Sequence, residues 1–286
     1  MGFLPLPLLL ALVATPMPPD RFAAWLLQAD RLQLERGCED PAIGAADARR
    51  RQIRDRLLVL NPAPQPFEVV MADATALLGC GSPDSAAVVL QRSSPGSPEQ
   101  RRRWLLLRWR AAAAGLDHRQ AALALRRLVD GDLQALATVT LQPGWSGLEQ
   151  LAEHEAALGH NLTAAELLLL APSPAPRQLS RAAEWLAPQH AERADALLDD
   201  ALELAAADQA WGLAKELLQQ QLRLQRAAGL SGDHPRQRLD RLTAQIEDHY
   251  SQWQLSGGVG EPPLLRSPRQ PGGHAAVGDS PDASLP

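Results

Sequence analysis

Arginine and tryptophan side chains are interleaved in one short stretch, the part of the chain whose residue types most suggest binding chemistry. Its members are Arg101, Arg102, Arg103, Trp104, Arg108, Trp109 and Arg110. Guanidinium groups neutralise phosphates and indole rings stack on bases, so this pattern is typical of proteins that bind single-stranded nucleic acid. The formal net charge of the chain is −5, however, and Trp104 is also expected in a helical core. Nucleic-acid binding through residues 101–110 is therefore our third hypothesis for function.

Trp145 is the tryptophan that we expect to be most exposed to solvent. It follows Pro143 and Gly144 in a predicted loop, whereas most other tryptophans lie on or near apolar stripes of predicted helices. An exposed tryptophan in a groove is a common anchor for a protein partner. We therefore name Trp145 and the five arginines of residues 101–110 as candidate partner-binding residues.

The segment from Gly144 to Leu148 has the residue types of a nucleophile elbow, in which a strained turn presents a serine for acyl transfer. Its second glycine comes one position too early, and no strand is expected before it. We expect Ser146 instead to cap the N-terminus of a helix. The glycines at Gly258 and Gly260 do not open a predicted helix, so they do not form a dinucleotide-binding turn.

Histidine and glutamate side chains gather near residue 154 and suggest a metal or acid–base site. His154 and Glu155 lack the second histidine, four positions after the first, that a zinc-binding helix requires. We expect His154 and His160 to be solvated beside a turn, and Glu149, Glu153 and Glu155 to form a charged solvent face. The sequence therefore predicts no catalytic residue, no metal site and no cofactor.

The two cysteines of the chain could form a disulfide. Cys38 and Cys80 follow Gly37 and Gly79 at the predicted ends of the first and third helices. In an up-down-up arrangement those ends lie at one pole, and a bond needs Cα atoms about 4.4–6.8 Å apart. An oxidising compartment would allow the bond, whereas two thiols are expected in the cytosol. Cysteine pairs at the spacing of structural zinc sites do not occur.

The N-terminus contains an apolar run over residues 3–14 that bears on the compartment. The run is too short for a bilayer, which needs about 20 helical residues, and suits the ~7–15 residues of a signal-peptide core. No Lys or Arg precedes it, and cleavage after Ala14 would place Leu12 where a small residue is preferred. We expect export, with residues 1–19 as signal peptide or hydrophobic segment. A cytoplasmic protein starting at Met17 and an uncleaved membrane anchor are the alternatives.

The composition predicts an all-α protein. The chain has 52 Leu and 49 Ala but only 10 Val, 3 Ile and 6 Thr, so residues that favour helices far outnumber β-branched residues. Apolar residues make up 45%, which is enough for a sizeable core. The 27 arginines against the single lysine, Lys215, indicate GC-rich coding, which we interpret as bacterial.

Apolar periodicity predicts helices from Asp20 to about Leu255, separated by Pro/Gly-rich breaks. The first and the last predicted helices cover residues 20–37 and 235–253. We expect four parts: the N-terminal segment, a helical region over 20–96, helical hairpins with a capping helix over 97–255, and a disordered tail over 256–286. In that tail 12 of 31 residues are Pro or Gly.

One stretch of small and large apolar residues follows the spacing of a known helical repeat. The matching positions are Leu148, Leu151, Ala152, Gly159, Ala164, Leu168 and Ala171. Residues 146–171 thus resemble a tetratricopeptide hairpin. Looser matches place further turns at Gly115 and Ala205, 44 and 46 residues from Gly159, where a regular array has 34. The resemblance implies an irregular α-solenoid of packed hairpins; an irregular helical bundle is the alternative.

Charge is distributed unevenly along the chain. Residues 41–130 hold 14 Arg and 8 acidic residues, a net +6, whereas residues 131–210 hold 3 Arg and 12 acidic residues, a net −9. This asymmetry favours complementary contacts within a superhelix or between subunits of a homo-oligomer; unequal solvated faces are the alternative.

A non-enzymatic interaction or scaffolding module is the function that the resemblance implies. Stacked hairpins leave a concave surface for a peptide or a partner helix, so we expect a protein or peptide partner. Membrane contact is expected only if residues 1–19 stay uncleaved. An all-α enzyme or an accessory subunit is the second hypothesis.

Overall fold

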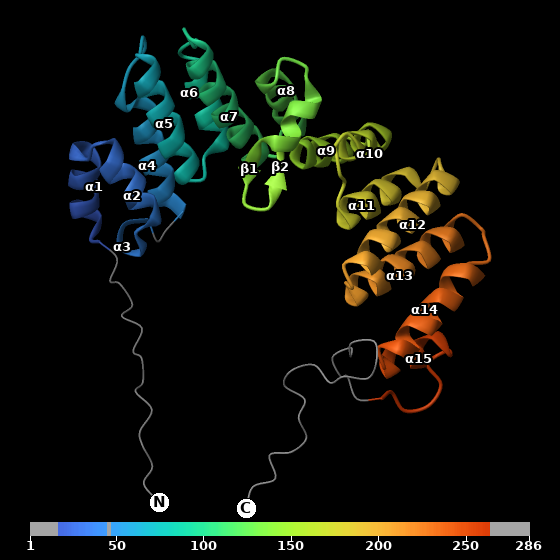
Figure 1. The fold of residues 1–286 in the computed structure, drawn as a ribbon. Coiled ribbons are helices and arrows are strands. Elements are labelled where there is room, and N and C mark those ends of the chain that lie inside the picture. Colours follow the sequence, from blue (N-terminus) through green and yellow to red (C-terminus); the bar gives the residue numbers. More distant parts are fainter. Residues whose placement is uncertain (1–16, 45–46, 264–286) are drawn as a thin grey trace, which may run out of the picture. The chain divides into compact units, whose positions relative to one another are not determined.

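The structure is a computed structural model that describes residues 17–44 and 47–263. These residues form fifteen α-helices, one 3-10 helix and one two-stranded antiparallel sheet (Figure 1). Neighbouring helices pack in succession along the chain, so the predicted all-α, solenoid-like fold is confirmed. The predicted signal segment lies almost wholly outside the described residues, as does the tail after Pro263.

The chain divides into two compact units between Gly131 and Asp132. The helix that begins at Pro98 packs on the helices before it, whereas the sequence predicts a division before residue 97. The described helices of the first unit are α1 (Pro19–Gln28), α2 (Arg31–Glu39), α3 (Pro41–Gly44), α4 (Asp47–Leu60), α5 (Phe67–Gly79), α6 (Pro83–Leu90), α7 (Pro98–Ala114) and α8 (His118–Leu128).

The second unit begins with the 3-10 helix η1 (Leu133–Thr138) and a β-hairpin, and continues as helices. The hairpin pairs β1 (Thr140–Gln142) with β2 (Trp145–Ser146). The helices are α9 (Gly147–Ala157), α10 (Asn161–Leu169), α11 (Pro176–Leu186), α12 (Ala191–Ala207), α13 (Trp211–Ala227), α14 (Asp233–Gln245) and α15 (His249–Leu255).

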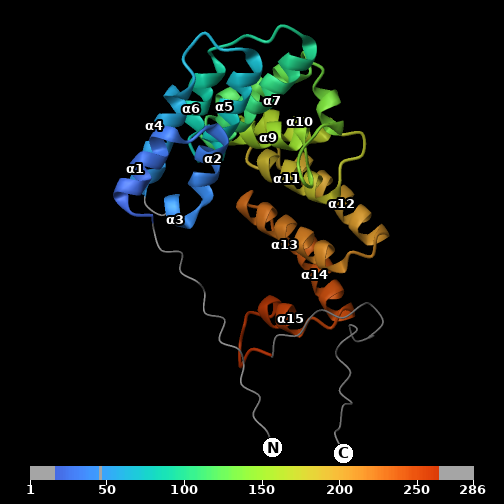
Figure 2. The ribbon, with the colours of Figure 1, turned by 90° about the vertical axis from the view of Figure 1, so that its left-hand side faces the viewer.

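A leucine- and alanine-rich cluster forms the core of the first unit, in which α5, α6 and α7 are neighbours (Figure 2). Leu34, Ile53 and Leu77 are completely buried in this cluster. Cys38 at the end of α2 and Cys80 after α5 are joined by a disulfide, with their Cα atoms 5.2 Å apart. The bond closes the two helix ends that the sequence places at one pole.

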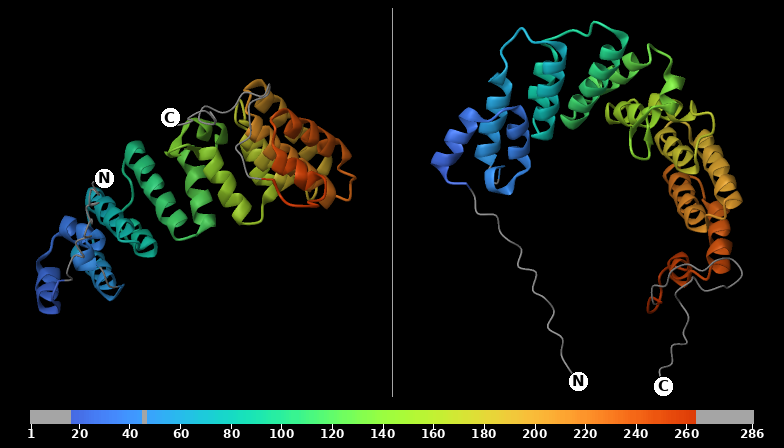
Figure 3. Two further views of the ribbon diagram at one scale, coloured as in Figure 1. Left: turned by 90° about the horizontal axis from the view of Figure 1, so that it is seen from below. Right: turned by 60° about the vertical axis from the view of Figure 1, so that its left-hand side comes forward.

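Helices α9 to α14 of the second unit pack one after another (Figure 3). Their contact faces are rich in alanine: Ala152, Ala164, Ala183 and Ala201 are completely buried. Because alanine adds only a methyl group, the backbones of neighbouring helices can approach closely, and leucines fill the remaining space.

Four of the turns between helices in the second unit share one hydrogen-bonded closure. Gly159, Gln209, Gly229 and Glu247 have positive φ angles of 81°, 55°, 77° and 53°. The residue after each donates its backbone N–H to the carbonyl five residues earlier, as in a Schellman motif. The turn expected at Ala205 is therefore wrong, since α12 continues past this buried alanine and ends before Gln209.

Two predicted helices are interrupted by capping aspartates. Asp30 accepts a hydrogen bond from Gln33 N, and the Gln33 side chain accepts one from Asp30 N, so α2 starts as a separate helix. Near the C-terminus, Asp248 accepts from Ser251 N and begins α15. The apolar seams continue across both breaks, so helical periodicity alone does not reveal them.

Candidate binding groove

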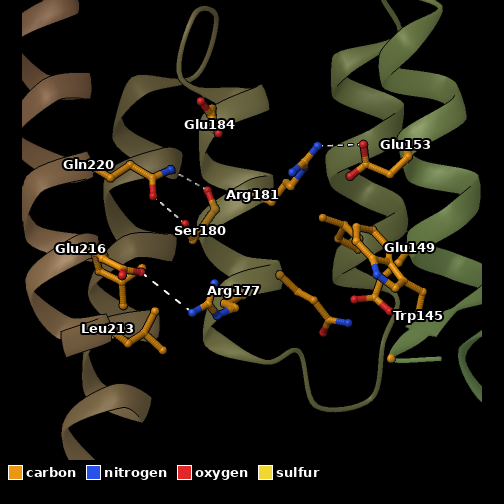
Figure 4. A pocket seen from close by; sticks show the side chains of 14 residues that line it. Trp145, Glu149, Glu153, Arg177, Ser180, Arg181, Glu184, Leu213, Glu216 and Gln220 are labelled. Carbon is orange, nitrogen blue, oxygen red and sulfur yellow. Dashed lines mark hydrogen bonds and ion pairs between the residues drawn. The ribbon is translucent and has the colours of Figure 1, made fainter. Parts of the chain in front are cut away.

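A groove with a cavity volume of about 470 Å³ lies on the second unit, on the face formed by α9, α11 and α13 (Figure 4). We call it the Trp145 groove, after the tryptophan that lines it together with residues of these three alternate helices. Its apolar contributions include Leu168, Leu213 and Leu217. Figure 4 shows polar side chains from α9, α11 and α13 converging on the same space.

The β-hairpin positions Trp145 at this groove. Pro143 and Gly144 form the turn between β1 and β2, and Gly144 has a φ of 79°, which suits the Pro-Gly pair of a type II turn. Trp145 keeps 40% of its surface exposed, so the expectation of an exposed tryptophan is confirmed.

Ser146 and Glu149 form a capping box at the start of α9. Ser146 Oγ accepts a hydrogen bond from Glu149 N at 3.3 Å, and Glu149 Oε2 accepts from Ser146 N at 2.7 Å. The prediction that Ser146 caps a helix is therefore confirmed. A short strand does precede this segment, contrary to expectation, because the Pro-Gly turn folds residues 140–146 into a hairpin.

Glu149 keeps its negative charge within the groove. Burial by itself would raise the pKa of this carboxyl group. Hydrogen bonds from Ser146 N, the Gln178 side chain and the Ser146 hydroxyl outweigh the burial, and they lower the pKa below its ordinary value. The groove therefore holds a fixed carboxylate beside Trp145 at neutral pH.

Two arginines of α11 lie one turn apart between acidic residues of the flanking helices. Arg181 Nη2 lies 2.7 Å from Glu153 Oε2 of α9, and Arg177 Nη2 lies 4.0 Å from Glu216 Oε2 of α13. Arg181 also stacks at 5.3 Å over the Trp185 ring. With four glutamates and two arginines among the lining residues, the Trp145 groove has a net charge of −2.

A pair of hydrogen bonds holds α11 against α13 at the groove. Ser180 Oγ donates to Gln220 Oε1 at 2.5 Å, and Gln220 Nε2 donates to the Ser180 carbonyl at 2.9 Å. Gln220 is buried, so both polar ends of its amide are satisfied inside the packing. The groove thus has a fixed wall, which favours binding without large rearrangement.

The predicted arginine-rich segment belongs to the first unit and is engaged in its packing. Trp109 is buried, and Trp104 Nε1 donates to the Leu90 carbonyl at 2.9 Å, so neither indole is free to stack on bases. Most of the arginines have partners: Arg101 pairs with Asp130, Arg103 with Glu68, and Arg108 with Gln120. Arg102 and Arg110 are exposed on α7.

The side chains of His154 and Glu155, both on α9, are buried and do not face solvent. They are 5% and 6% exposed, and Glu155 Oε2 lies 2.8 Å from His160 Nδ1. The expectations of a solvated His154 and an exposed Glu155 are therefore wrong. His160 supplies a polar partner for the buried Glu155 carboxylate.

No protein-family model matches the chain, and no curated protein is significantly similar to it in sequence. Within residues 17–44 and 47–263, no helix is both long and apolar enough to span a bilayer. In the same part of the chain, His, Cys, Asp and Glu side chains do not gather into a group of three or more that could hold a metal ion.

Proposed function

We propose that the protein is a non-enzymatic interaction module that binds a peptide segment or partner helix in the Trp145 groove. The observation that carries this proposal is the groove itself, which three alternate helices line together with a half-exposed tryptophan. Residues 146–171 form the first helical hairpin of this surface, and their tetratricopeptide-like spacing supports the same role. We also propose that this hairpin is tetratricopeptide-like.

The chemistry of the groove suits a peptide better than a small substrate. Aromatic and leucine side chains provide an apolar floor, while Glu149, Glu153, Arg177 and Arg181 provide a polar rim. Protein interfaces have this anatomy, in which a few aromatic and arginine residues contribute most of the binding energy. The arginines are already paired with glutamates, so a peptide would exchange or extend existing ion pairs.

The experiment is a peptide selection on the purified full chain, followed by calorimetry with the selected peptides. We expect W145A to weaken binding at least about 30-fold, because an anchoring tryptophan contributes about 2 kcal/mol or more. The matched control is L204A, since Leu204 is a similarly exposed apolar residue on α12, away from the lining of the groove. Equal affinities of the two variants, or a selection without enriched peptides, would contradict the proposal.

We further propose that the protein acts in an exported, oxidising compartment, such as a bacterial periplasm. The Cys38–Cys80 disulfide supports this location, because protein disulfides persist in oxidising environments and are rare in the cytosol. The apolar run of residues 3–14 has the length of a signal-peptide core.

A further inference from the structure

The first unit carries a groove of its own, which we call the arginine groove. It has a cavity volume of about 390 Å³ and is lined by Arg31 of α2, by residues of α5 and by Arg103 and Arg110 of α7. Leu106 contributes half-buried apolar surface, and Met71 and Leu107 lie beneath it at 9% and 5% exposure. An adjoining hollow of about 490 Å³ shares Arg31 and Glu68 with it.

The three arginines of this groove differ in how far their charges are already neutralised. Arg103 is fully engaged, because its two terminal nitrogens each lie 2.8 Å from an oxygen of Glu68. Arg110 is exposed and has no partner among the described residues. The arginine groove therefore has a net charge of +2, from three arginines and one glutamate.

Arg31 also retains capacity to bind an anion. Its Nε lies 3.9 Å from Asp73 Oδ1, beyond hydrogen-bond distance. Asp73 is buried and accepts hydrogen bonds from Asn61 Nδ2, at 3.0 and 2.9 Å to its two oxygens, and from Gln65 Nε2 at 3.5 Å. Because Asn61 satisfies the buried carboxylate, the half-exposed guanidinium of Arg31 keeps donors for a ligand.

We infer that the arginine groove binds an acidic peptide segment that carries apolar side chains between its carboxylates. Guanidinium groups pair with carboxylates through two parallel hydrogen bonds, which suits Arg31 and Arg110. The accessible apolar surface of Leu106, above the buried Met71 and Leu107, favours a peptide over a polyphosphate or nucleic acid, since these ligands offer little aliphatic surface. The net charge of the arginine groove is opposite in sign to that of the Trp145 groove, which is −2.

The test is fluorescence anisotropy on the full chain with a labelled peptide of alternating Glu and Leu. We expect R110E to weaken binding about tenfold or more, because it replaces an attractive charge by a repulsive one. R102E is the matched control: Arg102 lies exposed on the same helix, lines neither groove and has no partner among the described residues. We expect R102E to stay within about twofold of the wild type, because its charge lies outside the groove.

Any of the following results would overturn the inference. They are equal losses in R110E and R102E, tighter binding of a Lys/Leu peptide, tighter binding of an oligothymidine strand, and no binding of the Glu/Leu peptide up to about 1 mM. W145A separates this inference from the proposed function, because it alters only the groove of the second unit. We expect W145A to bind the Glu/Leu peptide as the wild type does; a loss of binding there would place the peptide in the Trp145 groove instead.

Discussion

Lys215, the only lysine of the chain, forms a partly buried ion pair with Asp248. Lys215 Nζ lies 2.7 Å from Asp248 Oδ2, and the two side chains are 21% and 7% exposed. Burial would raise the pKa of Asp248. Hydrogen bonds from Lys215, Ser251 N and the Ser251 hydroxyl, together with the charge of Lys215, outweigh it and lower the pKa below the ordinary value. One carboxylate thus both caps α15 and ties it to α13.

We predict that D248A lowers the free energy of unfolding by about 3 kcal/mol, because it removes a helix cap and leaves Lys215 without its partner. D248N should cost less, about 1–2 kcal/mol, since asparagine keeps the capping oxygen. Urea denaturation of the two variants measures both values. Equal costs for D248A and D248N would mean that the cap contributes nothing to stability.

The same pair predicts a specific dependence on pH. Because the pKa of Asp248 is lowered in the folded state, its stabilisation is complete above the unfolded pKa of about 3.9 and is lost as the pH falls through the folded pKa. D248N removes this titration, so its stability should fall less steeply than that of the wild type below about pH 4. Urea midpoints across this range provide the comparison, and parallel curves would contradict the assignment.

At the scale of elements, the hairpin that presents Trp145 depends on a close approach between α9 and η1. Gly147 N donates to the Val139 carbonyl at 2.7 Å. A Cβ atom on Gly147 would lie 2.9 Å from Leu136 Cδ2 and 3.1 Å from the Leu136 carbonyl oxygen. Leu136 is completely buried, so the backbone has little freedom to move away.

We predict that G147A lowers the free energy of unfolding by about 1–3 kcal/mol through overpacking, and weakens peptide binding in the Trp145 groove. G212A is the matched control, because a Cβ atom on Gly212 in α13 would meet nothing within 4 Å. Alanine is the better helix former, so G212A should stabilise by up to about 1 kcal/mol. Thermal and urea unfolding measure the change in stability of both variants. An unchanged stability of G147A would show that Leu136 can move to accommodate the added methyl group.

At the scale of the whole molecule, two units carry grooves of opposite charge. The first unit contains the Cys38–Cys80 disulfide, and the second contains the Trp145 groove. If both proposals hold, the chain connects two partners of different charge, as a scaffold does. The compartment decides which partners the protein can meet. Whether Cys38 and Cys80 are bonded in the cell reports that compartment.

We predict that the protein recovered from its native host, with thiols blocked during lysis, has an intact mass about 2 Da below that of the dithiol form, because each disulfide removes two hydrogens. It should also lack an N-terminal segment of about 14–20 residues, as expected for a cleaved signal peptide. If the chain came from the soluble cytoplasmic fraction and both cysteines carried the blocking group, the cysteines would have been free thiols in the cell. That result would contradict export. A full-length chain in the membrane fraction would indicate an anchor.

Much of the fold was predictable because helix formation is a local property. The leucine and alanine content, the apolar periodicity and the capping residue Ser146 all act within a few neighbouring positions. The exposure of Trp145 was predictable for the same reason, since a Pro-Gly turn excludes that position from a helix. The breaks at Asp30 and Asp248 were missed because the apolar periodicity continues across them.

What the amino-acid sequence alone determined, then, is the helical class, the main turns and the candidate cysteine pair. Only the tertiary structure decided which side chains share a site. Glu149, Arg181 and Gln220 lie on three helices that are separated by other helices along the chain. Their convergence depends on how the helices pack, and packing arises from shape complementarity between distant segments, which no local pattern encodes.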